Sequence, residues 1–409
     1  MFKRACEKMV AGLEKELENS PNAKQEINLV WAKNVLKCFE GNQPVSWLGF
    51  NFPPEIPLAL GYLTFYPEIA SGMLSGFNLS GDLLEFVERK YSNMFCCSFH
   101  RCAVGADAKG MWPKPSSILS VSNICDGQIK LMNIFGERHQ IKPLVLEAPF
   151  MPDSLNQKSA DYIEGQFKII IPQLERISGQ TLSEKRLLEV IKISNRSRSA
   201  LMRLNELRKR SPAPFHGPRA INSLYVLITQ LWGLPEVPDL IENLIKEIET
   251  SPVRSSENQE KFRLLIMIPP PTFKTQIYNW LEKEMGSNMV MTELTDVTWE
   301  EIDEEIPLKS LARKVISQPI LGTIEKRIDW VIKSIKDYNV DGVIHFSHWG
   351  CRQSIGGVGV IQKALEDINI PFLNLDVDLV DPRPFSPGQI YTRIQSFIEM
   401  LSQRKEEAL

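Results

Sequence analysis

The stretch from Asp341 to Ile368 constrains the possible folds of this chain most strongly. Its apolar run Gly342–Phe346 predicts a buried strand, and the Ser-His-Trp-Gly segment that follows predicts a turn. Periodic apolar residues then predict a helix over Ile355–Ile368. A buried strand followed directly by a helix is the unit of a parallel α/β sheet. Cys351, which lies in the turn, is therefore expected at the carboxyl end of a strand, where open α/β sheets bind ligands.

Strand and helix signals alternate in two separate parts of the chain. Short β-type runs lie at Val45–Phe50, Leu63–Tyr66, Ser117–Val121 and Pro143–Leu146, and a second βα series begins at Phe262. Residues between these series show helical periodicity with almost no strand signal, and the first forty residues predict two amphipathic helices. We therefore expect an α/β fold with two doubly wound parallel-sheet domains joined by a helical segment. The predicted parts are an N-terminal helical preface (1–41), a first α/β domain (42–154), a helical middle segment (155–254) and a second α/β domain (255–409).

Composition excludes several classes of protein. The 409 residues include 47 Lys and Arg and 50 Asp and Glu, a formal net charge of -3, which does not favour nucleic acid or an anionic membrane surface as a partner. No apolar run approaches the roughly 20 residues of a membrane span, and the N-terminus enters a charged helix without a secretion segment. The seven cysteines are odd in number, and three of them crowd into Cys96–Cys102, which is typical of a reduced compartment. We expect a cytoplasmic protein.

Three cysteines lie in predicted loops of the two α/β parts. Cys125 follows one predicted strand and immediately precedes a helix, as Cys351 does, and Cys97 lies in the turn after a helix that ends near Tyr91. A single free cysteine is usually a small buried hydrophobe. The spacing of these three is too wide for a zinc knuckle or a ferredoxin-type run, so any metal cluster would have to be assembled between domains.

Other chemistries find less support in the sequence. His345-x-x-His348-x-x-Cys351 provides zinc-type ligands, but His345 falls inside the predicted strand and is expected to point into packing. The sequence contains no Gly-x4-Gly-Lys-Ser/Thr run, no Gly-x-Gly-x-x-Gly fingerprint and no Gly-x-Ser-x-Gly elbow, so ATP and NAD are not expected as ligands. The charge run 196–210 is interpreted as a solvated helix face, with a partner contact as the alternative.

Several of these motifs occur together in a known family. Gly350-Cys351-Arg352, followed by Asp376-x-Asp378-x-x-Asp381-Pro-Arg383 and Gln389-Ile…Arg393, resembles the subunits of the 2-hydroxyacyl-CoA dehydratase and benzoyl-CoA reductase family. Cys97-Ser98…Arg101, Cys125-Asp126 and Leu204-Asn-Glu-Leu-Arg208 resemble the same family in the same order, so the resemblance covers nearly the whole chain.

The resemblance implies a [4Fe-4S] cluster held by Cys97, Cys125 and Cys351, with Cys96 and Cys102 structural. Three thiolates leave one iron open to a substrate oxygen or water, which distinguishes a catalytic cluster from an electron carrier. In such enzymes a separate ATP-hydrolysing activator protein supplies one electron, which reduces the thioester of a 2-hydroxyacyl-CoA to a ketyl radical; the 2-hydroxyl then leaves, and the electron returns. The resemblance further implies a partner that is either a homologous subunit or a second copy of the chain.

The predicted function is therefore the iron–sulfur subunit of an acyl-CoA dehydratase. Ser347 and His348 flank the cysteine loop and are the candidate catalytic residues; His348 is predicted to carry a proton or donate a hydrogen bond to the open site, with a loop-shaping role as the alternative. Two other functions stay open at this point. One is a benzoyl-CoA-reductase-like subunit that reduces an aromatic or small unsaturated substrate, and the other is a non-catalytic protein that binds a cluster or zinc.

Overall fold

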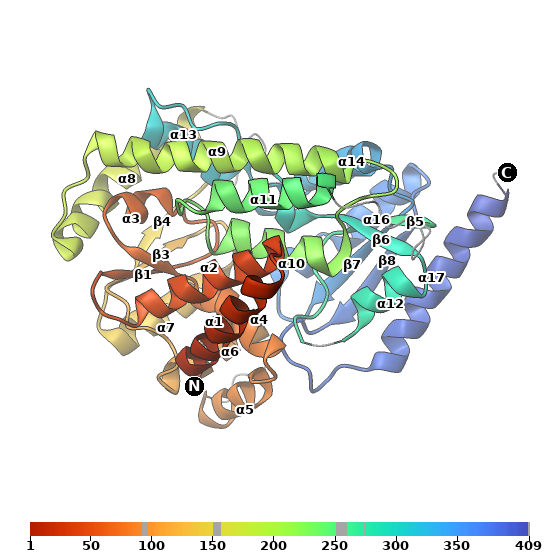
Figure 1. Cartoon of the computed structure of the whole chain (residues 1–409), viewed down its shortest axis with the longest axis horizontal. Coiled ribbons are helices and arrows are strands. Elements are labelled where there is room, and N and C mark those ends of the chain that lie inside the picture. Colours follow the sequence, from red (N-terminus) through yellow and green to blue (C-terminus); the bar gives the residue numbers. More distant parts are fainter. Residues whose placement is uncertain (92–95, 150–156, 251–259, 274, 408–409) are drawn as a thin grey trace.

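The computed structural model describes residues 1–91, 96–149, 157–250, 260–273 and 275–407 (Figure 1). These residues contain two four-stranded sheets in which all neighbouring strands are parallel. The first sheet has the order β2-β1-β3-β4 and the second has the order β6-β5-β7-β8. The strands are β1 (Val45–Leu48), β2 (Leu63–Phe65), β3 (Ser117–Val121), β4 (Leu144–Leu146), β5 (Phe262–Ile266), β6 (Ser287–Thr292), β7 (Gly342–His348) and β8 (Phe372–Val377). The predicted α/β fold with two parallel sheets is confirmed.

The two sheets follow the same path through space. In each, the chain leaves the first strand for one side, returns across it to the third strand, and ends on the fourth. The direction of winding therefore reverses between β1 and β3 in one sheet and between β5 and β7 in the other, which is where open sheets form a ligand crevice. Cys125 follows β3 and Cys351 follows β7, so the two cysteines occupy equivalent places in the two sheets.

Helices cover both sheets, and a helical middle separates the two sheets in the sequence (Figure 1). In the first part the helices are α1 (Phe2–Asn19), α2 (Ala23–Cys38), α3 (Glu55–Ala59), α4 (Pro67–Gly76), α5 (Ser80–Tyr91), α6 (Ser98–Ala108) and α7 (Asp126–His139). The helical middle has α8 (Gln157–Ser178), α9 (Glu184–Arg208), α10 (Gly217–Thr229) and α11 (Val237–Thr250). The last part has α12 (Ile277–Lys283), η1 (Glu293–Thr295), α13 (Pro307–Ser317), η2 (Pro319–Leu321), α14 (Ile324–Tyr338), α15 (Arg352–Ile355), α16 (Val358–Asp367) and α17 (Pro387–Glu407).

Sequence patterns missed three of these helices and merged two others. In α6 nearly every residue is buried, so it lacks the polar stripe that reveals a surface helix. The pattern also did not reveal α4 and α13, although α13 begins with a proline in its first turn. The helix predicted over Ile355–Ile368 is interrupted at Gly356 and Gly357, which separate α15 from α16. The predicted polar linker falls largely at 251–259, outside the described residues, and the domain limits stay predictions.

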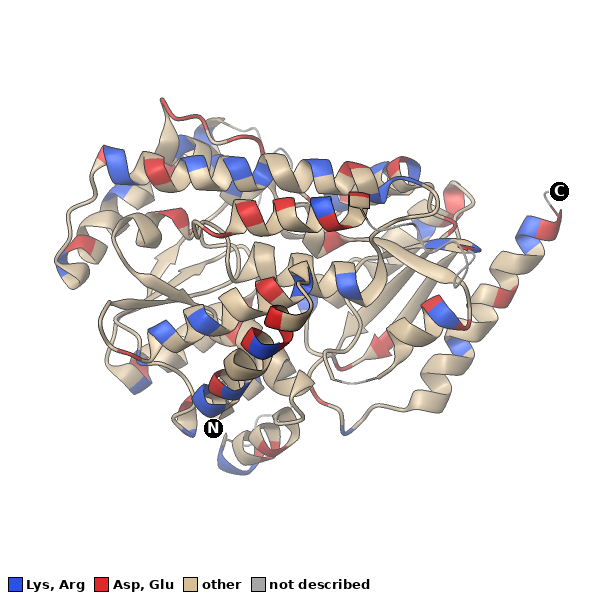
Figure 2. Cartoon of the chain, viewed as in Figure 1, with Lys and Arg blue, Asp and Glu red and all other residues tan. Residues whose placement is uncertain are grey.

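One hydrophobic core joins the two sheets. Its buried residues come from strands of both, and include Leu48 and Val121 of the first sheet and Ile266 and Phe346 of the second. Within the described part of the chain, no helix is long and apolar enough to cross a membrane. Both basic and acidic side chains lie along α9, whereas those of α11 are mostly acidic (Figure 2), and Arg196 of α9 pairs with Asp239 of α11.

Arg263 connects the helical middle to the second sheet. It lies on β5, is only 5% exposed, and its Nη1 forms an ion pair with Glu260 at 2.7 Å. Its nitrogens also donate to main-chain carbonyls at the end of α9, including that of Arg210 at 3.0 Å, and to the carbonyl of Tyr338 at 2.6 Å. These carbonyls have no partner inside a helix, so one guanidinium satisfies a helix end that would otherwise be buried without donors.

Replacing Arg263 with Met is expected to lower the free energy of unfolding by about 3 kcal/mol, because Glu260 and several buried carbonyls lose their donor. Urea titration followed by circular dichroism measures this change. The matched control is Arg196→Met, since Arg196 is an exposed ion-pair partner on α9 and its loss is expected to cost less than about 1 kcal/mol. Equal effects of the two variants would contradict the anchoring role of Arg263.

Candidate active site

A cavity of about 1590 Å³ lies at the carboxyl ends of both sheets. Phe50 follows β1, Cys125 follows β3, Ile268 follows β5 and Cys351 follows β7, and all four side chains line it. The carboxyl ends of parallel strands meet at one edge of a sheet, so two such edges build a single cleft from distant parts of the sequence. The cavity is larger than the roughly 300–1,000 Å³ of most ligand pockets, which leaves room for a long ligand as well as a cofactor.

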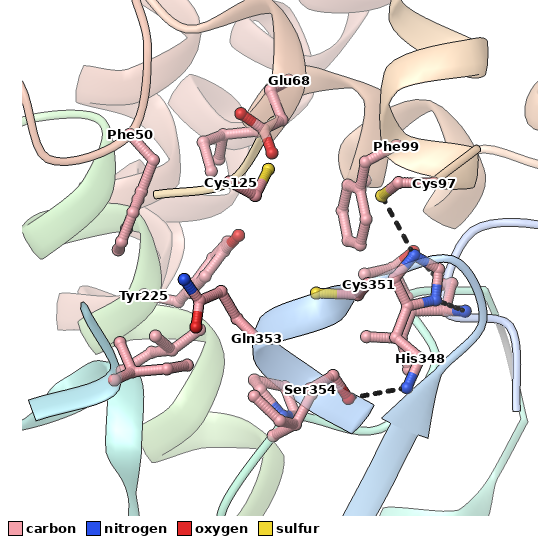
Figure 3. A pocket seen from close by; sticks show the side chains of 18 of the residues that line it. Phe50, Glu68, Cys97, Phe99, Cys125, Tyr225, His348, Cys351, Gln353 and Ser354 are labelled. Carbon is pink, nitrogen blue, oxygen red and sulfur yellow. Dashed lines mark hydrogen bonds between the residues drawn. The ribbon is translucent and has the colours of Figure 1, made fainter. Parts of the chain in front are cut away.

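The three predicted cysteines face this cavity from the starts of three helices (Figure 3). Cys97 precedes the first residue of α6, Cys125 that of α7, and Cys351 that of α15. The main-chain N–H of Gln128 donates to the Cys125 sulfur at 3.3 Å. Because the starts of α6 and α7 carry unpaired N–H groups and partial positive charge, their cysteines lie where negative charge is favoured.

The donor set suits a cluster better than a single ion. Among the described residues, no three His, Cys, Asp or Glu side chains lie close enough to hold one metal ion. Thiolates on a single zinc each lie about 2.3 Å from it. An iron–sulfur cluster has several metal atoms, so its ligands can stand around a wider space, as these three thiols do. The residues present therefore fit a cluster with three cysteine ligands.

Burial governs the ionisation of the free thiols. It raises the pKa of Cys125 to about 12 and raises the pKa values of Cys97 and Cys351, and the proximity of Cys351 raises that of Cys97 further. The three groups are therefore neutral thiols at physiological pH when no metal is bound. Metal binding would release their protons, as thiolate ligation requires.

His348 contacts the first of these cysteines. Its Nε2 lies 3.2 Å from the Cys97 sulfur, and the main-chain N–H of Leu379 donates to its Nδ1 at 3.1 Å. Because a main-chain N–H can only donate, Nδ1 must accept, and the neutral ring carries its proton on Nε2, directed at the sulfur. Burial lowers the pKa of His348 to about 4, so the ring is neutral at physiological pH.

The position of Cys97 depends on a carboxylate from the other half of the chain. Asp378, in the loop after β8, accepts from the Ser98 hydroxyl at 2.5 Å and from the main-chain N–H groups of Val380 and Asp381 at 2.8 and 2.7 Å. Arg101, one turn further along α6, pairs with Glu88. The carboxylate of Asp378 therefore fixes the first turn of α6, and with it Cys97, to the second sheet.

Two glycines allow the cysteine loops to approach other groups closely. Gly350 has φ +75°, and a Cβ there would lie 2.9 Å from the main-chain nitrogen of Cys97. A Cβ at Gly127 would lie 2.8 Å from the imidazole ring of His100. Larger residues at either place would push apart the loops that carry the thiols.

A partly buried carboxylate at this cavity was missed by sequence reasoning. Glu68, in the first turn of α4, accepts from Gln128 Nε2 at 3.0 Å and contacts His100 Nε2 at 3.1 Å. Burial alone would raise the pKa of Glu68, but the charge of His100 and these hydrogen bonds lower it. The Ser120 hydroxyl in turn donates to Gln128 at 2.9 Å, so a polar chain supports the carboxylate from behind. The sequence signal, an acidic residue after Pro67, is typical of many helix starts.

Ser347, His345 and Cys102 lie outside the described cavity wall. Ser347 is buried and donates to Asn374 Oδ1 at 2.7 Å, and its hydroxyl lies 3.2 Å from His345 Nδ1. His345 contacts the same Asn374 and points into packing, away from Cys351's cavity. Cys102 is fully buried, whereas Cys96 lines the cavity beside Cys97. The role of Ser347 stays a prediction.

The chain is similar in sequence to a family of known proteins. The profile of the family 2-hydroxyglutaryl-CoA dehydratase, D-component, matches residues 50–401. The chain is 27% identical to the (R)-phenyllactyl-CoA dehydratase alpha subunit of Clostridium sporogenes, over 93% of this chain and 95% of that protein. It is 26% identical to the (R)-2-hydroxyisocaproyl-CoA dehydratase alpha subunit of Clostridioides difficile, over 91% and 94%. It is 23% identical to one subunit of the benzoyl-CoA reductase of Thauera aromatica, over 80% and 82%.

The chain belongs to the 2-hydroxyglutaryl-CoA dehydratase D-component family, because the profile covers most of its length. The predicted family is confirmed, and with it the prediction of an enzyme of the acyl-CoA dehydratase or related reductase class. The relatives given above are all named as subunits of larger enzymes, which agrees with a protein that works beside other subunits.

Replacing Asp378 with Ala is expected to lower the free energy of unfolding by about 2–4 kcal/mol, because one hydroxyl and two main-chain N–H groups lose a charged acceptor. Urea unfolding measures the change. Asp376→Ala is the matched control, since Asp376 lies two residues earlier on an exposed face and its loss is expected to cost less than about 0.5 kcal/mol. An unchanged stability of the Asp378 variant would show that α6 is held by other contacts.

Proposed function

We propose that this chain is the iron–sulfur subunit of an activator-dependent 2-hydroxyacyl-CoA dehydratase. The observation that carries the proposal is the convergence of Cys97, Cys125 and Cys351 on one cavity that also contains a partly buried, charged Glu68. Similarity to two dehydratase alpha subunits along nearly their whole length supports the same reaction class. Cys97, Cys125 and Cys351 would hold a [4Fe-4S] cluster, and none of the described residues provides a fourth thiol at that cavity beyond the adjacent Cys96.

A cluster held by Cys97, Cys125 and Cys351 would, when bound, supply low-potential one-electron chemistry to the substrate thioester. The residues of the chain perform the remaining tasks. The apolar side chain of Phe99, which lies beside Cys97, excludes water from this end of the cavity. The Nε2–H group of His348 donates a hydrogen bond to the Cys97 sulfur. In the metal-bound protein this hydrogen bond would orient the Cys97 thiolate and stabilise its charge.

Glu68 is the proposed catalytic base. Once the 2-hydroxyl has left, the β-proton of the acyl radical is acidic, and a carboxylate that is held charged in the cavity accepts it. The departing hydroxide and this proton together make the water that is eliminated, so the reaction is a net dehydration. His100 and Gln128 keep the carboxylate oriented through hydrogen bonds at 3.1 and 3.0 Å.

Other proteins complete the system in this proposal. A separate ATP-hydrolysing activator delivers the electron, which agrees with the lack of a nucleotide-binding motif in this sequence. A homologous subunit or a second copy of the chain is the structural partner, since the (R)-phenyllactyl-CoA dehydratase beta subunit of Clostridium sporogenes also matches, at 22% identity. A reductive reaction on an aromatic acyl thioester is the second candidate function, which the similarity to the benzoyl-CoA reductase chain supports.

Protein purified without oxygen is expected to contain about four irons and four sulfides per chain and to give a paramagnetic resonance signal after reduction. Replacing Cys97, Cys125 or Cys351 with Ala is expected to lower the iron content, because each change removes one ligand. The matched control is Cys96→Ala, which removes the neighbouring thiol and is expected to retain iron. Zinc in place of iron, or unaltered iron in all three variants, would overturn the cluster assignment.

Glu68→Gln is expected to retain iron but to reduce dehydration by at least about 100-fold, because the amide cannot accept a proton. The assay supplies activator, ATP and a 2-hydroxyacyl-CoA, and it counts the electrons consumed per product. Glu85→Gln, a change to an exposed carboxylate on α5, serves as the control. Full activity in the Glu68 variant would exclude it as the base, and stoichiometric electron consumption would identify a reductase.

A further inference from the structure

The wall opposite Cys97 and Cys351 is lined by aromatic and aliphatic side chains. In Figure 3 the side chains of Phe50 and Tyr225 lie across the cavity from Cys97 and Cys351. Phe50 follows β1, and Tyr225 comes from α10 of the helical middle. Both pack against the core that joins the two sheets, and three buried members of that core, Ile221, Ile320 and Leu321, also line the cavity. A group held between Cys97, Cys351 and this wall would therefore contact the side chains of Phe50 and Tyr225 and these aliphatic neighbours.

The cations near this wall are already engaged. Arg327 lines the cavity, but its Nε and Nη2 donate to Glu293 at 2.6 and 2.9 Å, and its Nη1 donates to the carbonyl of Gln353 at 2.8 Å. Its side chain is only 5% exposed. A ligand carboxylate could displace these contacts only by leaving Glu293, itself buried, without its partner.

Of the remaining cations of the described lining, Lys130 and Arg352 are exposed and Lys24 is half-buried. Arg352 pairs with Asp126. Lys24 lies near Arg219, which is in the first turn of α10. Arg219 precedes Tyr225 by six residues, so the two residues are separated by about 9 Å along the helix axis. Exposed cations suit the phosphates of a long ligand better than a group held at the aromatic wall.

The charged group that does face the wall is an anion. The carboxylate of Glu68 lies near enough to the Tyr225 hydroxyl to raise its pKa, in addition to the larger effect of burial. The Tyr225 hydroxyl points into the cavity (Figure 3), and it has no hydrogen-bond partner within the described part of the chain. A second carboxylate on a bound acyl group near Tyr225 would therefore meet repulsion from Glu68 and a neutral hydroxyl in place of a cation.

We propose that Phe50 and Tyr225 form the acyl-binding wall and that it selects 2-hydroxyacyl groups with a large, uncharged side chain, of phenyl or branched-alkyl size, over small or dicarboxylic ones. This inference rests on the proposed function, because it takes the ligand to be a 2-hydroxyacyl-CoA. The aromatic rings supply apolar contact area, and the paired Arg327 and the charged Glu68 reject a second carboxylate.

Equilibrium binding tests the inference without turnover. Protein purified without oxygen is titrated by calorimetry with phenyllactyl-CoA, lactoyl-CoA, 2-hydroxyglutaryl-CoA and free coenzyme A. Phenyllactyl-CoA is expected to bind about 30-fold more tightly than lactoyl-CoA, the order of magnitude for burying a phenyl ring. 2-Hydroxyglutaryl-CoA is expected to bind no more tightly than lactoyl-CoA.

Variants then assign the preference to the wall. Phe50→Ala is expected to reduce the ratio of phenyllactyl to lactoyl affinity about tenfold, and Phe50→Leu, which keeps an apolar side chain, to reduce it less. Tyr225→Phe retains the ring and is expected to retain the ratio. Tyr162→Phe, a change to an exposed tyrosine on α8, is the control for the tyrosine substitution.

The outcomes separate the two levels of the proposal. Tightest binding of lactoyl-CoA or 2-hydroxyglutaryl-CoA, or an unchanged ratio in both Phe50 variants, would overturn the acyl-wall inference while the dehydratase function stands. If no acyl thioester binds more tightly than free coenzyme A, the proposed function itself fails, and the inference fails with it.

Discussion

The carboxylate of Asp378 is the interaction on which the site depends. It belongs to the loop after the last strand, yet it accepts a hydrogen bond from Ser98, 280 positions earlier, and from two main-chain N–H groups of its own loop. This contact fixes the start of α6 against the second sheet. Cys97 consequently reaches the Nε2 of His348, although the two residues come from different halves of the chain. The family motif that contains Asp378 thus has a structural reason, which is to place a thiol from one half against the other.

Cysteine positions that depend only on residues nearby in the chain could be predicted from the sequence. Cys125 and Cys351 each follow a strand and precede a helix, and a local pattern reveals both signals. Strand β7 extends two residues beyond the predicted end, however, and side chains alternate along a strand. Ser347 therefore faces Asn374 while His348 faces Cys97, a distinction that the loop interpretation of this segment did not reveal. Glu68 and Tyr225 were missed because they reach the cavity only after distant elements have packed together.

Charge in the cavity is controlled by pairing within the protein. Gln128 and His100 contact the carboxylate of Glu68, and Ser120 donates to Gln128 behind it. These contacts lower the pKa of Glu68, which burial alone would raise. Arg327 is neutralised by Glu293 on the neighbouring wall. The described lining therefore presents the carboxylate of Glu68, a second carboxylate, Asp126, that pairs with Arg352 at the surface, and three thiols that ionise only when a metal compensates their charge. A positively charged cluster core and a largely neutral acyl group suit these surroundings.

The cavity lies at the carboxyl ends of the strands in both sheets. The reaction therefore places no requirement on the amino-terminal ends of these strands. Among the described residues, those at the amino-terminal ends of the strands, such as Val45, Ser117 and Gly342, do not line the cavity. Insertions or new surface segments at those ends would leave the distances between the three sulfurs unchanged. In evolutionary terms, a chain of this design can acquire new contacts for other subunits on one side while the reacting groups on the other side stay in place.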